Sequence, residues 1–170
     1  MAGTGFLVTV TDLLRHPGTQ REVVVEGALD DLAMTTASVP AGAPVVFDGV
    51  LEAIADGSLT ATGVVRAPWA GECRRCLRAV QGELVAAVRE VFSMAPIDGE
   101  TYPLDHDRVD LEPMVRDAVL LNLPLAPLCD GGCEGPDPEG HPVEVETETE
   151  AEGDPGSDPR WGPLSELRFD

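Results

Sequence analysis

The stretch VVFDGVLEAIADGSLTATGVVRA, residues 45–67, decides the fold class. It holds two runs of β-prone residues, 45–54 and 59–67, on either side of Asp56-Gly57. An Asp-Gly pair between two such runs is typical of a β-hairpin, because glycine supplies the positive φ that a tight turn needs. The sequence therefore predicts two antiparallel strands near the middle of the chain.

Further strands are expected on both sides of this hairpin. Residues 6–10 and 21–29 are short β-prone runs, and residues 35–44, with two prolines, predict a loop or an irregular edge. Residues 81–92 could form a helix, but their valines and period-two spacing favour a strand.

One main helix is predicted over residues 110–121. Asp110 can cap it and Pro113 suits its first turn. A shorter helix is expected over residues 11–16, ending at Pro17-Gly18. The pattern predicts an α+β fold, mainly an antiparallel β-sheet or a partial barrel with one main helix. The apolar face of that helix is expected to hold Leu111, Val115, Ala118 and Val119.

The chain has a formal net charge of −20, and all 11 of its basic residues are arginine. Residues 1–133 hold 19 acids and 9 arginines, whereas residues 134–170 hold 12 acids and 2 arginines. The last part of the chain therefore carries half of the excess charge. Because an acidic surface repels phosphates, any contact with RNA would need a local basic patch.

The same distribution predicts the domain organisation. Residues 1–133 contain the expected strands and helices and form a β-rich folded domain. Residues 134–157 have few large apolar side chains and no basic ones, which predicts an acidic, disordered segment even though residues 143–150 alternate as a strand would. Residues 158–170 regain a tryptophan and leucines, which predicts a short C-terminal element.

No run approaches the roughly 20 apolar residues of a membrane span, and the apolar run at residues 6–10 is too short for an export signal. We therefore expect a cytoplasmic protein, in which thiols stay reduced. Four cysteines in two close pairs then indicate metal binding or redox chemistry rather than structural disulfides.

The strongest functional signal is Cys73-x-x-Cys76 together with Cys129-x-x-x-Cys133. The first pair falls between two predicted strands, where backbone N–H groups can point at the sulfurs. The second pair encloses Gly131-Gly132, which is flexible enough to turn both thiolates inward. Four soft ligands suit one tetrahedral ion, so the spacing predicts a metal knuckle that holds a single zinc ion.

Other interpretations of these cysteines stay open. An iron–sulfur cluster also uses four thiolates, and the thiols could instead lack any ligand. The arginines within Cys73-Arg74-Arg75-Cys76 would lower thiol pKa values in a redox pair, although a thioredoxin-like βαβ context is missing. Among three scattered histidines, His141 could replace a cysteine ligand, and His106 lies between two aspartates.

Arginines gather around the first cysteine pair, where only Glu72 opposes them. One interpretation of this cluster is a site for RNA phosphates or a partner protein, since guanidinium groups bind phosphate in bidentate fashion. The other is a solvated face that pairs with the acidic tail, residues 134–170. Trp69 could stack on a base or pack in the core. The candidate binding residues are Arg66, Trp69, Arg74, Arg75 and Arg78.

Several short motifs follow one another in a characteristic order. They are Asp12-Leu13-Leu14-Arg15-His16-Pro17-Gly18, Cys73-Arg74-Arg75-Cys76-Leu77, Leu123-Pro124-Leu125-Ala126-Pro127-Leu128-Cys129, Cys133-Glu134-Gly135 and Asp158-Pro159-Arg160-Trp161. In this order and spacing the chain resembles the bacterial YceD family, the large ribosomal RNA subunit accumulation proteins, and its opening looks like that of actinobacterial members.

The resemblance implies a role without known catalysis in the production of large-subunit rRNA. The sequence itself contains no phosphate-binding loop and no nucleophile elbow. It departs from the family where many members continue into a further CxxC, since residues 136–140 read PDPEG here. If the family's metal depends on those later cysteines, the site in this chain is reduced or lost.

We therefore carry three hypotheses. The first is a non-catalytic ribosome-biogenesis factor that supports 23S rRNA accumulation or processing by binding precursor rRNA or a ribosomal protein, with the acidic tail shielding the arginines or mimicking RNA. The second is a thiol redox enzyme or sensor built on Cys73 and Cys76. The third is a protein-binding adaptor. No membrane and no small-molecule substrate is expected.

Overall fold

In the computed structural model, the described residues are 5–129, 133 and 135. The acidic segment predicted at residues 134–157, apart from Gly135, lies outside this part of the chain, as do the predicted C-terminal element and His141. The described residues form eight strands and two helices. These are β1 (Leu7–Thr9), α1 (Thr11–Leu14), β2 (Gln20–Ala28), β3 (Ala37–Ser38), β4 (Pro44–Ala53), β5 (Leu59–Glu72), β6 (Ala79–Ser93), β7 (Tyr102–Pro103), β8 (Arg108–Asp110) and α2 (Glu112–Asn122).

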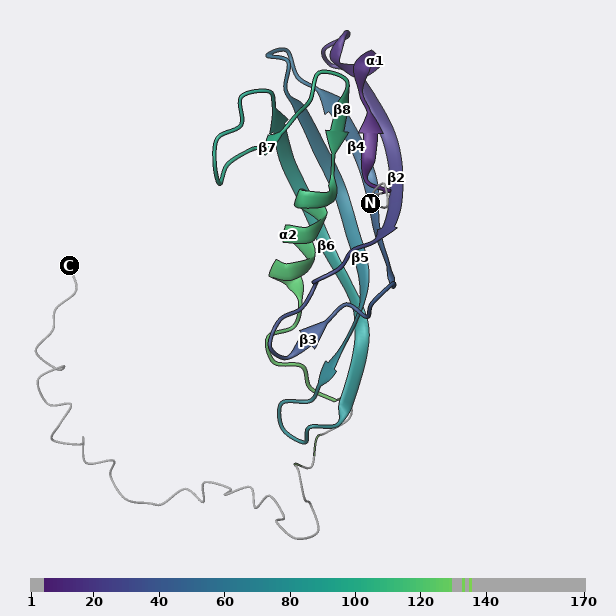
Figure 1. Cartoon of the computed structure of the whole chain (residues 1–170), viewed down its shortest axis with the longest axis vertical. Coiled ribbons are helices and arrows are strands. Elements are labelled where there is room, and N and C mark those ends of the chain that lie inside the picture. Colours follow the sequence, from purple (N-terminus) through teal and green to yellow (C-terminus); the bar gives the residue numbers. More distant parts are fainter. Residues whose placement is uncertain (1–4, 130–132, 134, 136–170) are drawn as a thin grey trace, which may run out of the picture.

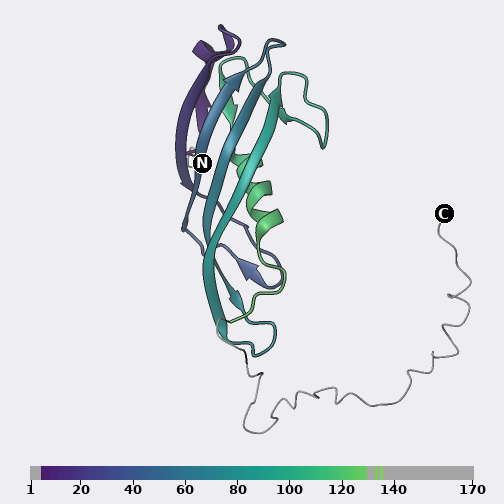
Figure 2. The ribbon, with the colours of Figure 1, turned by 180° about the vertical axis from the view of Figure 1, so that it is seen from behind.

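The main sheet has the strand order β2-β4-β5-β6-β7, and β3 pairs with the far end of β5. Its neighbours run antiparallel except for β6 and β7, which are parallel, and β1 and β8 form a small sheet of their own. Helix α2 lies across one face of the long strands (Figure 1), and the other face is left uncovered by the described elements (Figure 2). The predicted α+β class with one main helix is confirmed, and among the described residues the sheet does not close into a barrel.

The predicted hairpin is formed by β4 and β5. Ile54 donates its N–H to the carbonyl of Ser58 at 2.8 Å, and Gly57 has a φ of +84°. The Asp56 carboxylate accepts a hydrogen bond from the Ser58 N–H at 2.8 Å, and that bond lowers the pKa of Asp56. The turn closes as the Asp-Gly pair predicts, and β5 then continues beyond the predicted end to Glu72.

The core lies between the sheet and α2. Along β4 the side chains of Val45, Phe47 and Leu51 are fully buried, and the residues between them are more exposed. The Phe47 ring lies over Gly49 and Gly63, where an added Cβ would come within 2.7 and 2.9 Å of ring atoms. Helix α2 contributes the buried side chains Met114, Val115, Ala118 and Val119.

Helix α2 begins two residues later than predicted, at Glu112. Asp110 still helps to start it, because its carboxylate accepts the Glu112 N–H at 3.0 Å. Neither helix in the described part of the chain combines the length and apolar character that a bilayer crossing requires. The end of α2 sets the point from which the chain turns toward the second cysteine pair.

Candidate metal centre

The first cysteine pair lies in the tight connection between β5 and β6. These strands stay paired to their last residues, Glu72 and Ala79, so residues 73–78 must reverse the chain at once. Cys73 donates its N–H to the carbonyl of Arg78, and Leu77 donates to the carbonyl of Cys73, both at 2.8 Å. Leu77 has a φ of +58°, the left-handed conformation that glycine adopts most easily. The result is a knuckle at the tip of the hairpin.

The second pair is brought to this knuckle by the segment that follows α2. Leu123 ends the helix in an extended conformation, with φ −60° and ψ 136°. Arg74 donates its backbone N–H to Pro127 O at 2.9 Å and its guanidinium to Leu125 O at 3.2 Å. Thr36 Oγ1 donates to Pro124 O at 3.1 Å from the other side. The proline-rich segment is thus fixed along the knuckle before it reaches Cys129.

The four sulfurs meet at one point. Cys73 Sγ lies 3.7 Å from Cys133 Sγ, Cys76 Sγ lies 3.8 Å from Cys129 Sγ, and all four lie within 4.8 Å of one another. Sulfurs around a tetrahedral ion with bonds of about 2.3 Å are about 3.8 Å apart. A disulfide would bring two of them to about 2.0 Å, and all four cysteines are free. The donor set and its spacing therefore fit one thiophilic metal ion.

The thiols differ in how tightly they hold their protons. Backbone N–H groups of Cys76 and Arg75 lower the pKa of the Cys73 thiol to about 6. Hydrogen bonds to the sulfurs of Cys133 and Cys73 raise the pKa of the Cys129 thiol to about 12. One thiolate is thus favoured near neutral pH, and a cation bound here would displace the remaining protons.

The two histidine alternatives have different outcomes. Among the described residues, these four cysteines are the one group of His, Cys, Asp and Glu side chains close enough together to hold an ion. His106 is exposed beside β8 and does not belong to it. His141 lies outside the described residues, so its suggested role as a substitute ligand stays a prediction.

Comparison with known proteins identifies a family that matches the chain. The family described as "Large ribosomal RNA subunit accumulation protein YceD" matches residues 61–168, a span that includes both cysteine pairs. The chain belongs to the YceD family. The resemblance found in the sequence motifs is thereby confirmed.

Curated relatives of this YceD-family chain occur in mycobacteria. Uncharacterized proteins of Mycobacterium tuberculosis and Mycobacterium bovis are 36% identical over 138 residues, which is 76% of this chain and 65% of theirs. The chain thus spans less than two thirds of the length of these relatives. An uncharacterized protein of Mycobacterium leprae is 30% identical over 93% of this chain and 75% of its own length. No solved structure matches the chain significantly.

The arginines of the knuckle are exposed. Neither Arg74, Arg75 nor Arg78 lies within ion-pair distance of a carboxylate in the described part of the chain, whose two ion pairs are Arg108–Asp107 and Arg116–Glu112. The Arg74 guanidinium donates to Leu125 O, so part of its hydrogen-bonding capacity is used within the fold. Arg75 and Arg78 carry the positive charge of the knuckle most freely.

Arg66 and Trp69 point to opposite faces of the sheet. Arg66 lies between the buried residues Val65 and Ala67 and is exposed on the uncovered face. Trp69 is partly buried and packs against the core, over Gly82, where an added Cβ would lie 2.9 Å from its ring. Of the two uses predicted for Trp69, the structure supports packing, and it does not bring Trp69 onto one surface with Arg66.

A hollow beside the knuckle was not predicted from the sequence. It has a volume of about 380 Å³ and lies between the loop before β3 and the knuckle. Met34 and Leu77, both exposed, line it together with Arg74. The only sequence signal is two large apolar residues in polar loops, which is too common to single out a site.

Proposed function

We propose that this YceD-family protein supports the accumulation of large-subunit (23S) rRNA without catalysis, by binding precursor rRNA through a zinc-stabilised knuckle. The observation that carries the proposal is the meeting of four cysteine sulfurs directly beside exposed arginines. Zinc would be held by Cys73, Cys76, Cys129 and Cys133. It would fix the turn so that Arg75 and Arg78 present their guanidinium groups in one orientation, as bidentate phosphate contacts require.

The charge of the protein supports a local rather than a general RNA contact. With a net charge of −20, most of the surface repels phosphates, so the knuckle would determine how RNA approaches. The role would be cytoplasmic, because ribosomes are assembled there and a reducing environment keeps the thiols available for metal.

A gel-shift titration tests the RNA contact directly. The full-length protein, an Arg75→Gln/Arg78→Gln variant and an Arg89→Gln/Arg108→Gln control are titrated against fragments of large-subunit rRNA over a range of salt concentrations. Both variants lose two positive charges, but only the first loses them at the knuckle. The proposal expects weaker binding and a salt slope reduced by about 1–2 for the knuckle variant alone. An equal loss of RNA affinity in both variants would show that the knuckle arginines act only through the overall charge of the protein.

A ribosomal protein is the second candidate partner. The hollow lined by Met34 and Leu77 favours it, since exposed apolar side chains beside a polar rim suit a protein contact. A pull-down that survives nuclease treatment, and that is lost on Leu77→Ser, would identify this route. Loss of the captured protein with nuclease would instead point to RNA.

The redox alternative rests on the lowered pKa of Cys73. However, Cys73 is fully buried, and its sulfur lies 3.7 Å from Cys133 Sγ, so Cys76 is not its only near partner. A redox role predicts reversible formation of a Cys73–Cys76 disulfide in metal-free protein, detected by mass spectrometry of peptides. The zinc proposal predicts mixed pairings in that experiment, because all four sulfurs lie close together.

A further inference from the structure

Among the described residues, the outer edge of β6 is unpaired over most of its length. β6 pairs with β5 from Ala79 to Phe92, but on its other side β7 pairs only with Phe92 and Ser93. Within residues 5–129, no backbone hydrogen bond other than those of the β5 ladder involves residues 80–91. In an antiparallel pair every second residue directs its N–H and C=O away from the partner strand, so this edge offers unused backbone groups. In both ribbon views β6 lies at the margin of the sheet (Figures 1 and 2).

Helix α2 lies alongside this edge and forms a groove with it. A hollow of about 140 Å³ is lined by Ala87, Val88 and Arg89 of β6 and by Leu121 and Asn122 of α2. Leu121 is 84% exposed, which is unusual for a leucine on a helix that packs against a core. An extended peptide placed between a strand edge and a helix can use both the backbone groups and such an apolar side chain.

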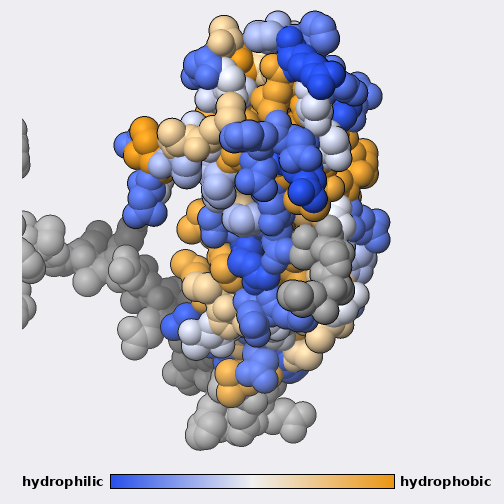
Figure 3. Space-filling view, turned by 45° about the horizontal axis from the view of Figure 1, so that its top comes forward, coloured by the Kyte–Doolittle hydropathy of each residue, from blue (hydrophilic) through white to orange (hydrophobic). Residues whose placement is uncertain are grey.

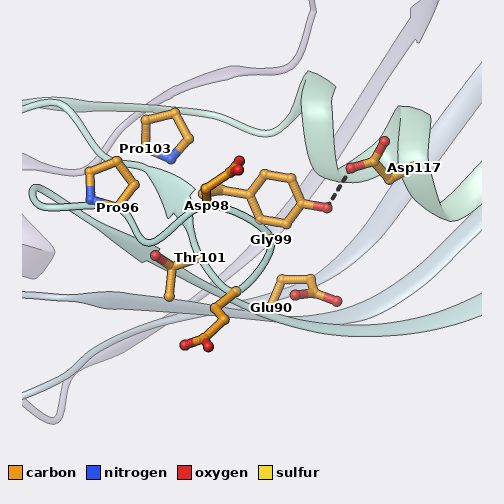
Figure 4. A pocket seen from close by; sticks show the side chains of 9 residues that line it. Glu90, Pro96, Asp98, Gly99, Thr101, Pro103 and Asp117 are labelled. Atoms are coloured by element: carbon orange, nitrogen blue, oxygen red, sulfur yellow. Dashed lines mark hydrogen bonds between the residues drawn. The ribbon is translucent and has the colours of Figure 1, made fainter.

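One end of the groove is strongly acidic. A second hollow of about 620 Å³ lies there, lined by Glu90, Asp98, Glu100 and Asp117 around Tyr102, with no basic residue in its wall (Figure 4). The Tyr102 hydroxyl donates to Asp117 Oδ2 at 2.8 Å. Burial, this bond and the charges of Asp117 and Glu90 raise the pKa of Tyr102. Carboxylates around an aromatic ring suit a guanidinium or ammonium group.

The two hollows are neighbours, because Glu90, Tyr102 and Asp117 line both of them. Where the described residues form the face seen in Figure 3, hydrophobic side chains appear as separate patches among hydrophilic ones. Four carboxylates exclude a phosphate backbone from this site by repulsion. A narrow, positively charged polypeptide fits both the unpaired strand edge and the carboxylates.

We propose that the free edge of β6 and helix α2 bind an extended, basic segment of a partner protein by strand addition. One apolar side chain of the segment packs against Val88 and Leu121, and one arginine or lysine enters the acidic hollow around Tyr102. This surface is distinct from the zinc knuckle and goes beyond the proposed RNA contact. Its binding does not require the zinc ion.

Fluorescence anisotropy of a labelled synthetic peptide tests the proposal on the full-length protein. The peptide alternates threonine and valine and carries an arginine at each end, so that it can add to β6 in either direction. A second peptide is identical except for methyl groups on alternate backbone nitrogens, which remove hydrogen-bond donors and keep the charge. We expect the unmodified peptide to bind at least tenfold more tightly and to slow amide hydrogen exchange within residues 80–91.

Two matched variants separate the groove from general electrostatic attraction. Glu90→Gln/Asp98→Asn removes two charges at the acidic hollow, and Glu22→Gln/Glu26→Gln removes two from β2 at the opposite margin of the sheet. The first is expected to weaken peptide binding at least fivefold and the second less than twofold. Equal weakening by both, equal affinity for the methylated peptide, or no measurable binding would each overturn the proposal. None of these results would affect the RNA contact of the knuckle.

Discussion

The backbone N–H of Arg74 donates a hydrogen bond to the carbonyl oxygen of Pro127, with 2.9 Å between nitrogen and oxygen. This bond joins the hairpin that carries the first cysteine pair to the segment that carries the second. The two segments are more than 50 positions apart in the chain, and the bond holds them together beside the sulfurs. Hydrogen exchange at the Arg74 amide therefore reports whether the two segments are held together.

Removal of metal should therefore loosen this contact. With zinc at about a thousand times its Kd, binding adds about 4 kcal/mol to the free energy of unfolding. We expect chelation to lower Tm by on the order of 10 °C and to speed hydrogen exchange at the Arg74 amide. His106→Ala, at an exposed histidine outside the cysteine group, is the control and should keep the Tm and the Arg74 exchange rate of the untreated protein. Unchanged exchange at Arg74 after chelation would show that the contact forms without metal.

Leu77 is expected to limit the stability of the knuckle. Its φ of +58° is strained for a residue with a side chain, and the side chain is 68% exposed, so little packing is lost on its removal. Leu77→Gly should raise the free energy of unfolding by about 0.5–1 kcal/mol in chemical denaturation. Arg75→Gly, at a position without positive φ, is the matched control and should lower it. A lower free energy of unfolding in both variants would show that the backbone at Leu77 is not strained.

Tyr102 gives a prediction for high pH. Its hydroxyl donates to Asp117, and the pKa of Tyr102 is raised above the ordinary value of 10.0. A raised folded-state pKa means that the contribution to stability is complete below about pH 10 and declines as the pH rises further. Tyr102→Phe should lower the free energy of unfolding by about 1 kcal/mol at pH 7. The difference between the variant and the wild-type protein should become smaller above pH 10, where the wild-type protein loses this contribution. A difference in free energy of unfolding that stays constant up to pH 11 would contradict this prediction.

The acidic tail should weaken RNA binding by charge alone. Removal of residues 136–170 deletes most of the tail's excess negative charge and should strengthen binding to rRNA fragments at least threefold at low salt. The difference should shrink toward 1 M salt, where the screening length falls to about 3 Å. A full-length variant with glutamine at Glu144, Glu146, Glu148 and Glu150 tests charge at constant length. Equal, negligible binding by intact and truncated protein would remove the shielding idea.

Local signals in the sequence predicted most of the fold. The hairpin at residues 45–67, the strand at 81–92 and the helix near 110–121 are each specified by turn chemistry, valine spacing or helix-start residues within a short window. β7 and β8 were missed because they have two and three residues, and such short strands exist only through their partners. The parallel pairing of β6 with β7 depends on chain path and has no local signal.

The meeting of the four cysteines could be predicted from the sequence, whereas the surface around them could be predicted less well. The spacing of the two cysteine pairs indicated that Cys73, Cys76, Cys129 and Cys133 would meet, and their sulfurs lie within 4.8 Å of one another. Which face a residue occupies depends on strand register, which is why Arg66 and Trp69 could be grouped in sequence and yet lie on opposite faces. The hydrogen bond from Arg74 to Pro127 is a tertiary contact that only the folded chain reveals.

The most direct measurement is the metal content of the purified protein by mass spectrometry, combined with thiol counting before and after chelation. The account predicts one zinc per chain, with the thiols protected until the chelator removes the ion and four reactive thiols afterwards. Purified protein that holds no metal before any chelation, and whose thiols react at once or already form disulfides, would contradict it.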